Sequence, residues 1–357
     1  MDRFVRISVR NLVEYVLRSG DIDNRFVSMS RAVEGTLAHQ RVQKGYAKGD
    51  LKEVVLKHSM EYGEFTFQIE GRADGILFTD DGIVIDEIKS TTRDLKELTE
   101  DVNLRHWAQG ICYGYIYAYQ NGLEKIGIQL TYFHLETEDT ARLRRTMSFA
   151  ETEGFFLDLL DRFIRWAGLT FDWGKKRDES IGILEFPFPS YRRGQRELAV
   201  AAYKTIKEGK SLFAQAPTGI GKTMSTLYPA LKAMGEGQSD KIFYLTAKTL
   251  TREVPLYSME LLSRRGLRAK SLVITAKDKI CLNDEVKCNP RDCPYAKGHF
   301  DRVNDAIIDL FDKEDLLTRD IIERYSQKHR VCPFEFQLDM SLWSDVVICD
   351  YNYVFDP

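Results

Sequence analysis

The chain has 357 residues, of which 43% are hydrophobic and 29% are charged, and its formal net charge is only −3. This length predicts about two domains, with enough apolar residues to give each a core. The small net charge excludes a globally basic protein, so any contact with nucleic acid has to come from local clusters. No apolar run reaches the ~18 residues of a membrane span, and the N-terminus lacks a signal-peptide core. We therefore expect a cytoplasmic protein with no membrane contact.

Two expected helices, at residues 7–19 and 30–44, open the first half of the chain, and His39 lies in the second. Two expected strands follow at residues 64–79 and 83–90. Asp81-Gly82 between them is a strong signal for a two-residue hairpin turn.

This hairpin predicts which side chains meet. It predicts paired residue numbers that sum to 163, which places Asp74 opposite Lys89. Because side chains alternate between the faces of a strand, Asp74, Glu87 and Lys89 should share one face and Asp86 the other. Two converging carboxylates favour Mg²⁺ or Mn²⁺, and the lysine can neutralise charge that develops on a phosphodiester. The alternative is a surface ion pair between Glu87 and Lys89 on an edge strand.

A helix at residues 101–120, ended by Asn121-Gly122, comes next and carries Gln109 and Tyr113 on one face. A strand at 125–135 and an amphipathic helix at 155–166 would complete this region.

The motifs GTLAH, GRADG, EIK and QGICY stand here in order, and with them the chain resembles the RecB-type PD-(D/E)XK nucleases. The resemblance implies a mixed sheet flanked by helices, and we assign residues 1–175 to that domain. It also implies that Asp74, Glu87 and Lys89 are catalytic, that Gln109 and Tyr113 position the DNA backbone, and that His39, Asp74 and Glu87 bind the metal. An irregular linker is expected at residues 176–187, since prolines at 187 and 189 oppose a regular helix.

The second half contains Ala216-x-x-x-x-Gly221-Lys222-Thr223, the spacing of a phosphate-binding P-loop. We expect a short buried strand at 212–216 before it and a helix at 224–234 after it. Gly219 and Gly221 allow the turn to aim its N–H groups at an anion. Lys222 would contact the terminal phosphates of ATP and Thr223 the accompanying Mg²⁺. Strands that alternate with helices on either side predict a parallel α/β sheet.

Four cysteines, Cys281, Cys288, Cys293 and Cys332, are separated by gaps of six, four and thirty-eight residues. Four thiolates can bind one Zn²⁺ or a [4Fe–4S] cluster. Zinc sites favour two short Cys-x₂₋₄-Cys pairs, and only one pair here is that close, so the irregular spacing favours the cluster, with zinc as the alternative. Cys112 and Cys349 lie in apolar runs and are expected to be core thiols.

The segments APTGIGKT, ITAKDKICLN, RDCPY, VCPFE and DVVICDYNYVFDP together resemble the XPD/DinG family of iron–sulfur DNA helicases. The resemblance implies that residues 188–357 form the first part of a RecA-like motor lobe, with the iron–sulfur insert at about 278–335. It also implies that Gln195 contacts the nucleotide base. In that family a DEAH box and a second lobe follow, so a fragment of a longer protein is expected.

We therefore expect a DNA-processing nuclease–helicase, in which metal-dependent phosphodiester hydrolysis is joined to an ATP-dependent iron–sulfur motor. Expected partners are DNA with a single-stranded portion, the remaining helicase half and repair proteins. Basic clusters at Arg142–Arg145, Arg192–Arg196 and Arg264–Lys270 would contact phosphates. The rival hypotheses are a nucleotide-gated DNA-binding module without catalysis, and a zinc-stabilised ATPase unrelated to DNA.

Overall fold

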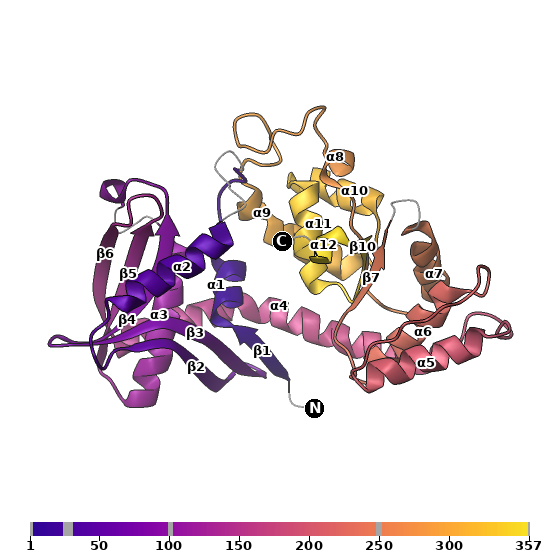
Figure 1. Ribbon diagram of the computed structural model, residues 1–357, viewed down its shortest axis with the longest axis horizontal. Coiled ribbons are helices and arrows are strands. Elements are labelled where there is room, and N and C mark those ends of the chain that lie inside the picture. Colours follow the sequence, from indigo (N-terminus) through magenta and orange to yellow (C-terminus); the bar gives the residue numbers. More distant parts are fainter. Residues whose placement is uncertain (1–2, 24–30, 99–102, 248–251, 356–357) are drawn as a thin grey trace. The chain divides into compact units, whose positions relative to one another are not determined.

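The protein, described here from a computed structural model, forms two compact units whose elements are labelled in Figure 1. Residues 3–23, 31–98, 103–247 and 252–355 are described, without the side chains of residues 31–34. The first unit comprises Met1–Arg18 with Arg25–Gly168, and the second comprises Ser19–Asn24 with Leu169–Pro357.

The first unit is built on a mixed six-stranded sheet with the order β1-β3-β4-β5-β6, in which β2 also pairs with β3. Pairing is parallel for β1 with β3 and for β4 with β5, and antiparallel elsewhere. The strands are β1 (Phe4–Ser8), β2 (Leu51–Tyr62), β3 (Phe65–Thr79), β4 (Gly82–Thr91), β5 (Lys125–His134) and β6 (Thr140–Ser148).

Helices cover both faces of this sheet. On one face, Ala38 and Val42 of α2 pack against Ile88. On the other face, Gln109 of α3 reaches Lys89. The helical elements are α1 (Val9–Leu17), α2 (Arg31–Lys44), the 3-10 helix η2 (Leu95–Glu97), α3 (Leu104–Asn121) and α4 (Phe149–Ile183). Gly122 ends α3 in the left-handed conformation, as the Asn-Gly signal predicts.

Some expectations for this unit are wrong in detail. The hairpin pairs Thr79 with Gly82 and Gly75 with Asp86, so paired numbers sum to 161 and the expected sum of 163 is two residues out. A register shift of two residues leaves every side chain on its expected face of the sheet, because side chains alternate along a strand with a period of two. Residues 7 and 8 belong to β1 rather than to a helix, and β2 and β6 are strands that were not expected.

The expected linker at 176–187 is irregular only from residue 184 onward, because α4 continues to Ile183. The two compact units divide inside this helix, between Gly168 and Leu169. Trp173 and Ile181 lie on one face of the last turns of α4, and both side chains are buried within the second unit. Burial of that face stabilises the helix, and the prolines come only after it.

The second unit contains an all-parallel four-stranded sheet with the order β7-β10-β8-β9, consistent with a RecA-like lobe. Its strands are β7 (Ile242–Thr246), β8 (Ser271–Val273), β9 (Leu316–Leu317) and β10 (Val346–Asp350). Its helices are α5 (Gln195–Lys207), α6 (Lys222–Gly235), α7 (Glu253–Arg264), α8 (Lys277–Ile280), α9 (His299–Lys313), α10 (Arg319–His329), α11 (Pro333–Trp343) and α12 (Asn352–Phe355).

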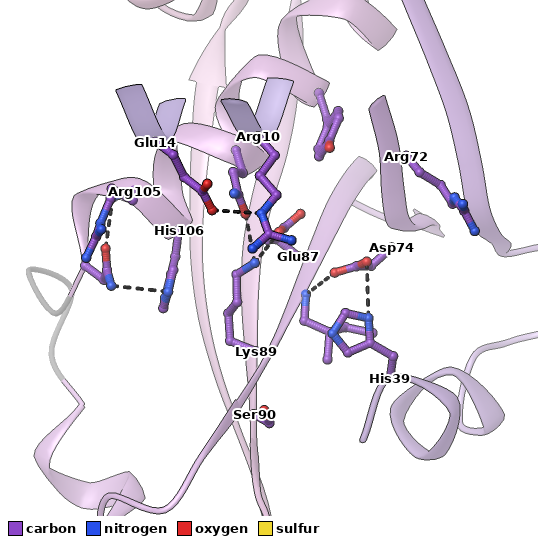
Figure 2. Close-up of a pocket in the computed structure, with 14 residues that line it drawn as sticks. Arg10, Glu14, His39, Arg72, Asp74, Glu87, Lys89, Ser90, Arg105 and His106 are labelled. Carbon is purple, nitrogen blue, oxygen red and sulfur yellow. Dashed lines mark hydrogen bonds and ion pairs between the residues drawn. The ribbon is translucent and has the colours of Figure 1, made fainter. Parts of the chain in front are cut away.

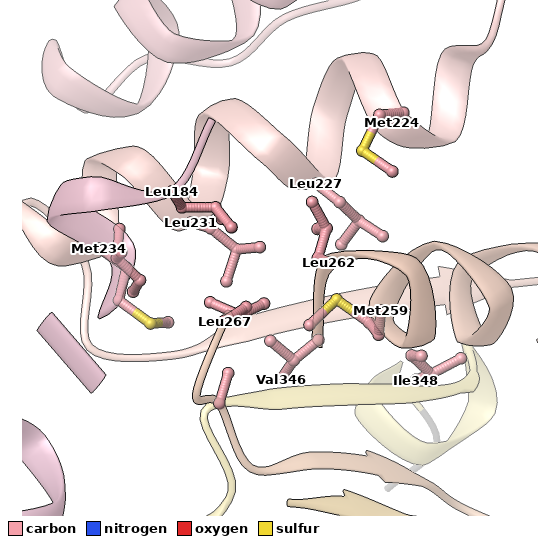
Figure 3. Packing of buried hydrophobic residues seen from close by; sticks show 12 residues of the cluster. Leu184, Met224, Leu227, Leu231, Met234, Met259, Leu262, Leu267, Val346 and Ile348 are labelled. Atoms are coloured by element: carbon pink, nitrogen blue, oxygen red, sulfur yellow. The ribbon is translucent and has the colours of Figure 1, made fainter. Parts of the chain in front are cut away.

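The core of this unit joins α6 and α7 to β10. Figure 3 shows Leu227 and Leu231 of α6 with Met259 and Leu262 of α7 and Val346 of β10. This packing fixes the start of α6, the helix that follows the P-loop.

The expected buried strand at 212–216 does not form, and the Phe213 side chain is 99% exposed. A strand needs a neighbour for its backbone groups, and within the described residues β7 pairs only with β10. No helix in the described part of the chain is both long and apolar enough to cross a membrane.

Candidate functional site

Asp74 lies at a break in the pairing of β3. On one edge, β3 pairs with β1 as far as Glu70 and with β4 from Gly75 onward. The Asp74 carboxylate faces this gap, where its Oδ2 accepts a hydrogen bond from the Ile88 N–H at 2.7 Å. The side chain is therefore held in one orientation at the wall of an open cavity of about 570 Å³ (Figure 2).

Glu87 enters the same cavity from β4 and is only 4% exposed. Its Oε1 accepts a hydrogen bond from Lys89 Nζ at 2.6 Å, and Lys89 Nζ also donates to Gln109 Oε1 at 2.8 Å. Glu87 Oε2 is buried and has no hydrogen-bond partner among the described residues. Burial raises the pKa of the Glu87 carboxyl to about 7 against the opposing effect of Lys89. A buried carboxylate oxygen without a partner is costly unless a cation or a proton occupies it.

His39, from α2, lies on the other side of Asp74. Its Nδ1 is 3.3 Å from Asp74 Oδ1, and that hydrogen bond raises the pKa of the imidazole. Within the ranges that the structure describes, His39, Asp74 and Glu53 form the one group of three possible ligands whose ligand atoms all lie within 4.8 Å of one another.

Glu53 is the residue that sequence reasoning missed. It lies in β2 with a left-handed backbone, at φ 52°, and its carboxylate accepts hydrogen bonds from Gln43 and Arg72. The alternation in residues 56–62, after the apolar pair Val54-Val55, could have predicted the strand. Nothing local could have placed Glu53 beside Asp74.

Tyr113 completes the expected set, four residues after Gln109 on α3. It lines the cavity, and burial followed by the nearby Glu87 and Asp74 charges raises the pKa of its hydroxyl. The ring fits because Gly71 faces it: a Cβ on that residue would meet the Tyr113 hydroxyl oxygen at 2.7 Å. The structure thus brings His39, Asp74, Glu87, Lys89, Gln109 and Tyr113 to one cavity.

Cations from three elements surround this group. Arg10 of α1, Arg72 of β3 and Arg105 of α3 line the cavity with Lys89. Such a rim suits a phosphodiester backbone. In the expected basic cluster at Arg264–Lys270, Lys270 is not available to DNA, because it is fully buried against Asp315, whereas the three arginines at 264, 265 and 268 are exposed.

The P-loop has the backbone that its glycines predict. Gly219 and Gly221 have φ of 83° and 86°, and Gly221 is the N-cap of α6. Lys222 Nζ donates to the Ala216 carbonyl at 3.0 Å, and the Thr223 hydroxyl accepts from the Tyr244 hydroxyl at 3.3 Å. A helix N-terminus preceded by such a turn presents N–H groups to an anion.

Gln195 is buried under this loop. Its Oε1 accepts from the Arg192 N–H at 3.0 Å, and its Nε2 donates to the Gly221 carbonyl at 3.5 Å. In this conformation the Gln195 amide hydrogen-bonds to the backbone of the P-loop, whereas the resemblance implies that it contacts the nucleotide base.

Cys281, Cys288, Cys293 and Cys332 line one small enclosed cavity. Cys293 Sγ accepts a hydrogen bond from Asn283 at 3.0 Å, and burial raises the pKa of the Cys332 thiol to about 11. Cys112 and Cys349 are buried elsewhere in apolar surroundings, as expected.

The four thiols are less close together than those of a tetrahedral zinc site, in which sulfur atoms lie ~3.8 Å apart. No three of their Sγ atoms, all of them in the described ranges, lie within 4.8 Å of one another.

Comparison with known proteins bears on the second unit. Residues 196–287, which include the P-loop, match the family model described as DEAD/DEAH box helicase. This match identifies a helicase-related, nucleotide-binding segment.

A relative agrees with that class. Over 120 residues the chain is 29% identical to a protein of Methanocaldococcus jannaschii named "Probable ATP-dependent helicase MJ0942". The matched stretch covers 34% of this chain and 18% of that relative. A solved structure titled "Crystal structure of SSO0001" matches 43% of this chain and 75% of its own chain. The TM-score of that match is 0.30 and the sequence identity is 19%.

Proposed function

We propose that this chain combines a Mg²⁺- or Mn²⁺-dependent deoxyribonuclease with part of an ATP-dependent DNA helicase that carries a [4Fe–4S] cluster. The nuclease hypothesis is supported best by one observation: Glu87 Oε2 is buried and unpaired in a cavity that also holds Asp74, His39 and Lys89. A resident cation would remove the cost of that oxygen.

In this proposal Asp74 and His39 bind the metal together with Glu53, whose ligand atom lies within 4.8 Å of theirs. The expected ligand Glu87 falls outside that close group, and we propose that it contacts the metal through its buried Oε2 from the wall of the same cavity. When bound, the metal supplies an activated water and stabilises charge on the phosphate. The chain's own part is positioning. The Ile88 N–H orients Asp74, and Glu87 and Gln109 hold the Lys89 ammonium where it can stabilise the charged transition state.

The decisive experiment for the nuclease uses end-labelled single-stranded, duplex and splayed DNA with Mn²⁺ or Mg²⁺. We expect cleavage by the parent protein, none by Glu87→Gln, and parental cleavage by Glu136→Gln, which removes a charge from an exposed loop. Equal cleavage by Glu87→Gln and the parent would contradict the proposal. Binding of DNA without cleavage by the parent would favour the non-catalytic rival.

For the second unit, the match to the helicase model and the P-loop geometry support ATP binding by Gly219, Gly221, Lys222 and Thr223. The presence of Cys281, Cys288, Cys293 and Cys332 around one cavity supports a metal centre there. Anaerobic purification tests the cofactor: a brown protein that absorbs near 400 nm supports it, and a colourless zinc protein contradicts it.

A further inference from the structure

A short segment from the beginning of the chain belongs structurally to the second unit. Ser19–Asn24 clusters with Leu169–Pro357, although residues of the first unit flank it in sequence on both sides. We call its described residues 19–23 the strap. The contacts of the strap are with the cysteine region, more than 270 residues further along the chain.

The strap caps helix α9. This helix begins after Gly298, which has no side chain to accept from the first-turn N–H groups. The Phe300 N–H instead donates to the Gly20 carbonyl at 3.0 Å, and the Gly298 N–H donates to Asp21 Oδ1 at 2.6 Å. In return, the Gly20 N–H donates to Asp301 Oδ1 at 2.8 Å.

The capped turn holds one of the four cysteines. His299, the first residue of α9, accepts a hydrogen bond at its Nδ1 from the Cys332 N–H at 3.1 Å. The strap, the first turn of α9 and Cys332 are therefore linked through consecutive hydrogen bonds.

Ile22 closes the cavity itself. Its N–H donates to the Ala296 carbonyl at 3.0 Å, and its side chain is only 5% exposed. It packs on Cys293 and Ala296, with Cys288 and Cys332 at the edge of the same apolar cluster.

We propose that residues 20–22 are a closing strap of the metal centre: Ile22 excludes water from the four thiols, while Gly20 and Asp21 hold the helix that positions Cys332. This inference rests on the proposed metal centre for its chemical consequence. The apolar shell around a metal site controls access of solvent and oxidants.

The test uses the full chain, purified anaerobically and reconstituted with ferrous iron and sulfide. Ile22→Ala should release iron to a chelator, and lose absorbance near 400 nm in air, about tenfold faster than the parent. Asp21→Ala, which removes the bond to Gly298, should change these rates in the same direction. Ile183→Ala is the matched control, because this isoleucine is 83% exposed, and it should behave like the parent. Parental rates for Ile22→Ala would overturn the proposal.

Hydrogen exchange on the metal-free chain keeps the strap testable if the cofactor assignment fails. The Gly20 and Ile22 amides should exchange slowly, since both are hydrogen-bonded, and Asp21→Ala should speed their exchange. If the parent takes up no iron but its Gly20 and Ile22 amides are protected from exchange, the cofactor assignment is refuted and the contacts of the strap are confirmed. Unprotected amides in the parent would refute the strap.

Discussion

His106 should keep a neutral imidazole far below the pH at which free histidine gains a proton. It lies in the first turn of α3 and lines the same cavity as Glu87. Burial, followed by the Lys89 and Arg105 charges, lowers the pKa of His106 to about 3. Its Nε2 faces the Asn103 amide nitrogen at 3.2 Å and its Nδ1 the Tyr132 hydroxyl at 2.9 Å. A proton on Nε2 would therefore point at another donor.

This pKa sets the sign of a pH effect on stability. Between pH 6.5 and about 3 the unfolded chain binds a proton at His106 that the folded chain does not bind, so unfolding becomes easier as the pH falls. A pH of 5 lies ~1.5 units below the ordinary pKa of histidine. The free energy of unfolding therefore falls by ~2 kcal/mol at most when the pH is lowered to 5. Partial exposure of the ring reduces this to ~1 kcal/mol.

Two measurements test the reasoning. The protein has six histidines, and the imidazole resonance that disappears in His106→Asn assigns this one. We expect that resonance not to titrate between pH 8 and 5, and we expect His106→Asn to lose less stability than the parent when the pH falls from 8 to 5. Titration of the assigned resonance near pH 6.5 would refute the argument.

Three further predictions concern the other sites. Lys222→Ala should abolish the calorimetric heat of Mg–ATP binding while Lys207→Ala, at an exposed position, retains it; equal heats would remove the P-loop assignment. Gly71→Ala should lower the free energy of unfolding, measured with urea, by ~1–3 kcal/mol, because the new Cβ would meet the Tyr113 hydroxyl. In the control Gly154→Ala the new Cβ meets nothing within 4 Å, so the free energy of unfolding should stay the same or rise slightly. Equal effects of the two substitutions would show that Tyr113 does not pack as described. Glu53→Gln should weaken Mn²⁺ binding, followed by electron paramagnetic resonance, about tenfold relative to Glu136→Gln if Glu53 is a ligand; unchanged affinity would exclude it.

The amino-acid sequence alone determined the features that depend on local spacing. Alternation along the strands placed Asp74, Glu87 and Lys89 on one face and Asp86 on the other, where Asp86 accepts hydrogen bonds from Tyr46 and Thr131. A four-residue spacing placed Gln109 and Tyr113 together on α3. Glycines at 219 and 221 predicted a turn with positive φ before a helix. These features follow from the periodicity and the backbone freedom of a few neighbouring residues.

Only the tertiary structure decided which distant segments meet. It set the hairpin register two residues from the expected one, continued α4 into the expected linker as far as Ile183, and left residues 212–216 without a strand partner. It also brought Glu53 to Asp74 and Ile22 to the cysteines. Such contacts depend on the packing of whole elements and on which backbone groups find partners across the chain, and neither is encoded in the spacing of residues within one segment.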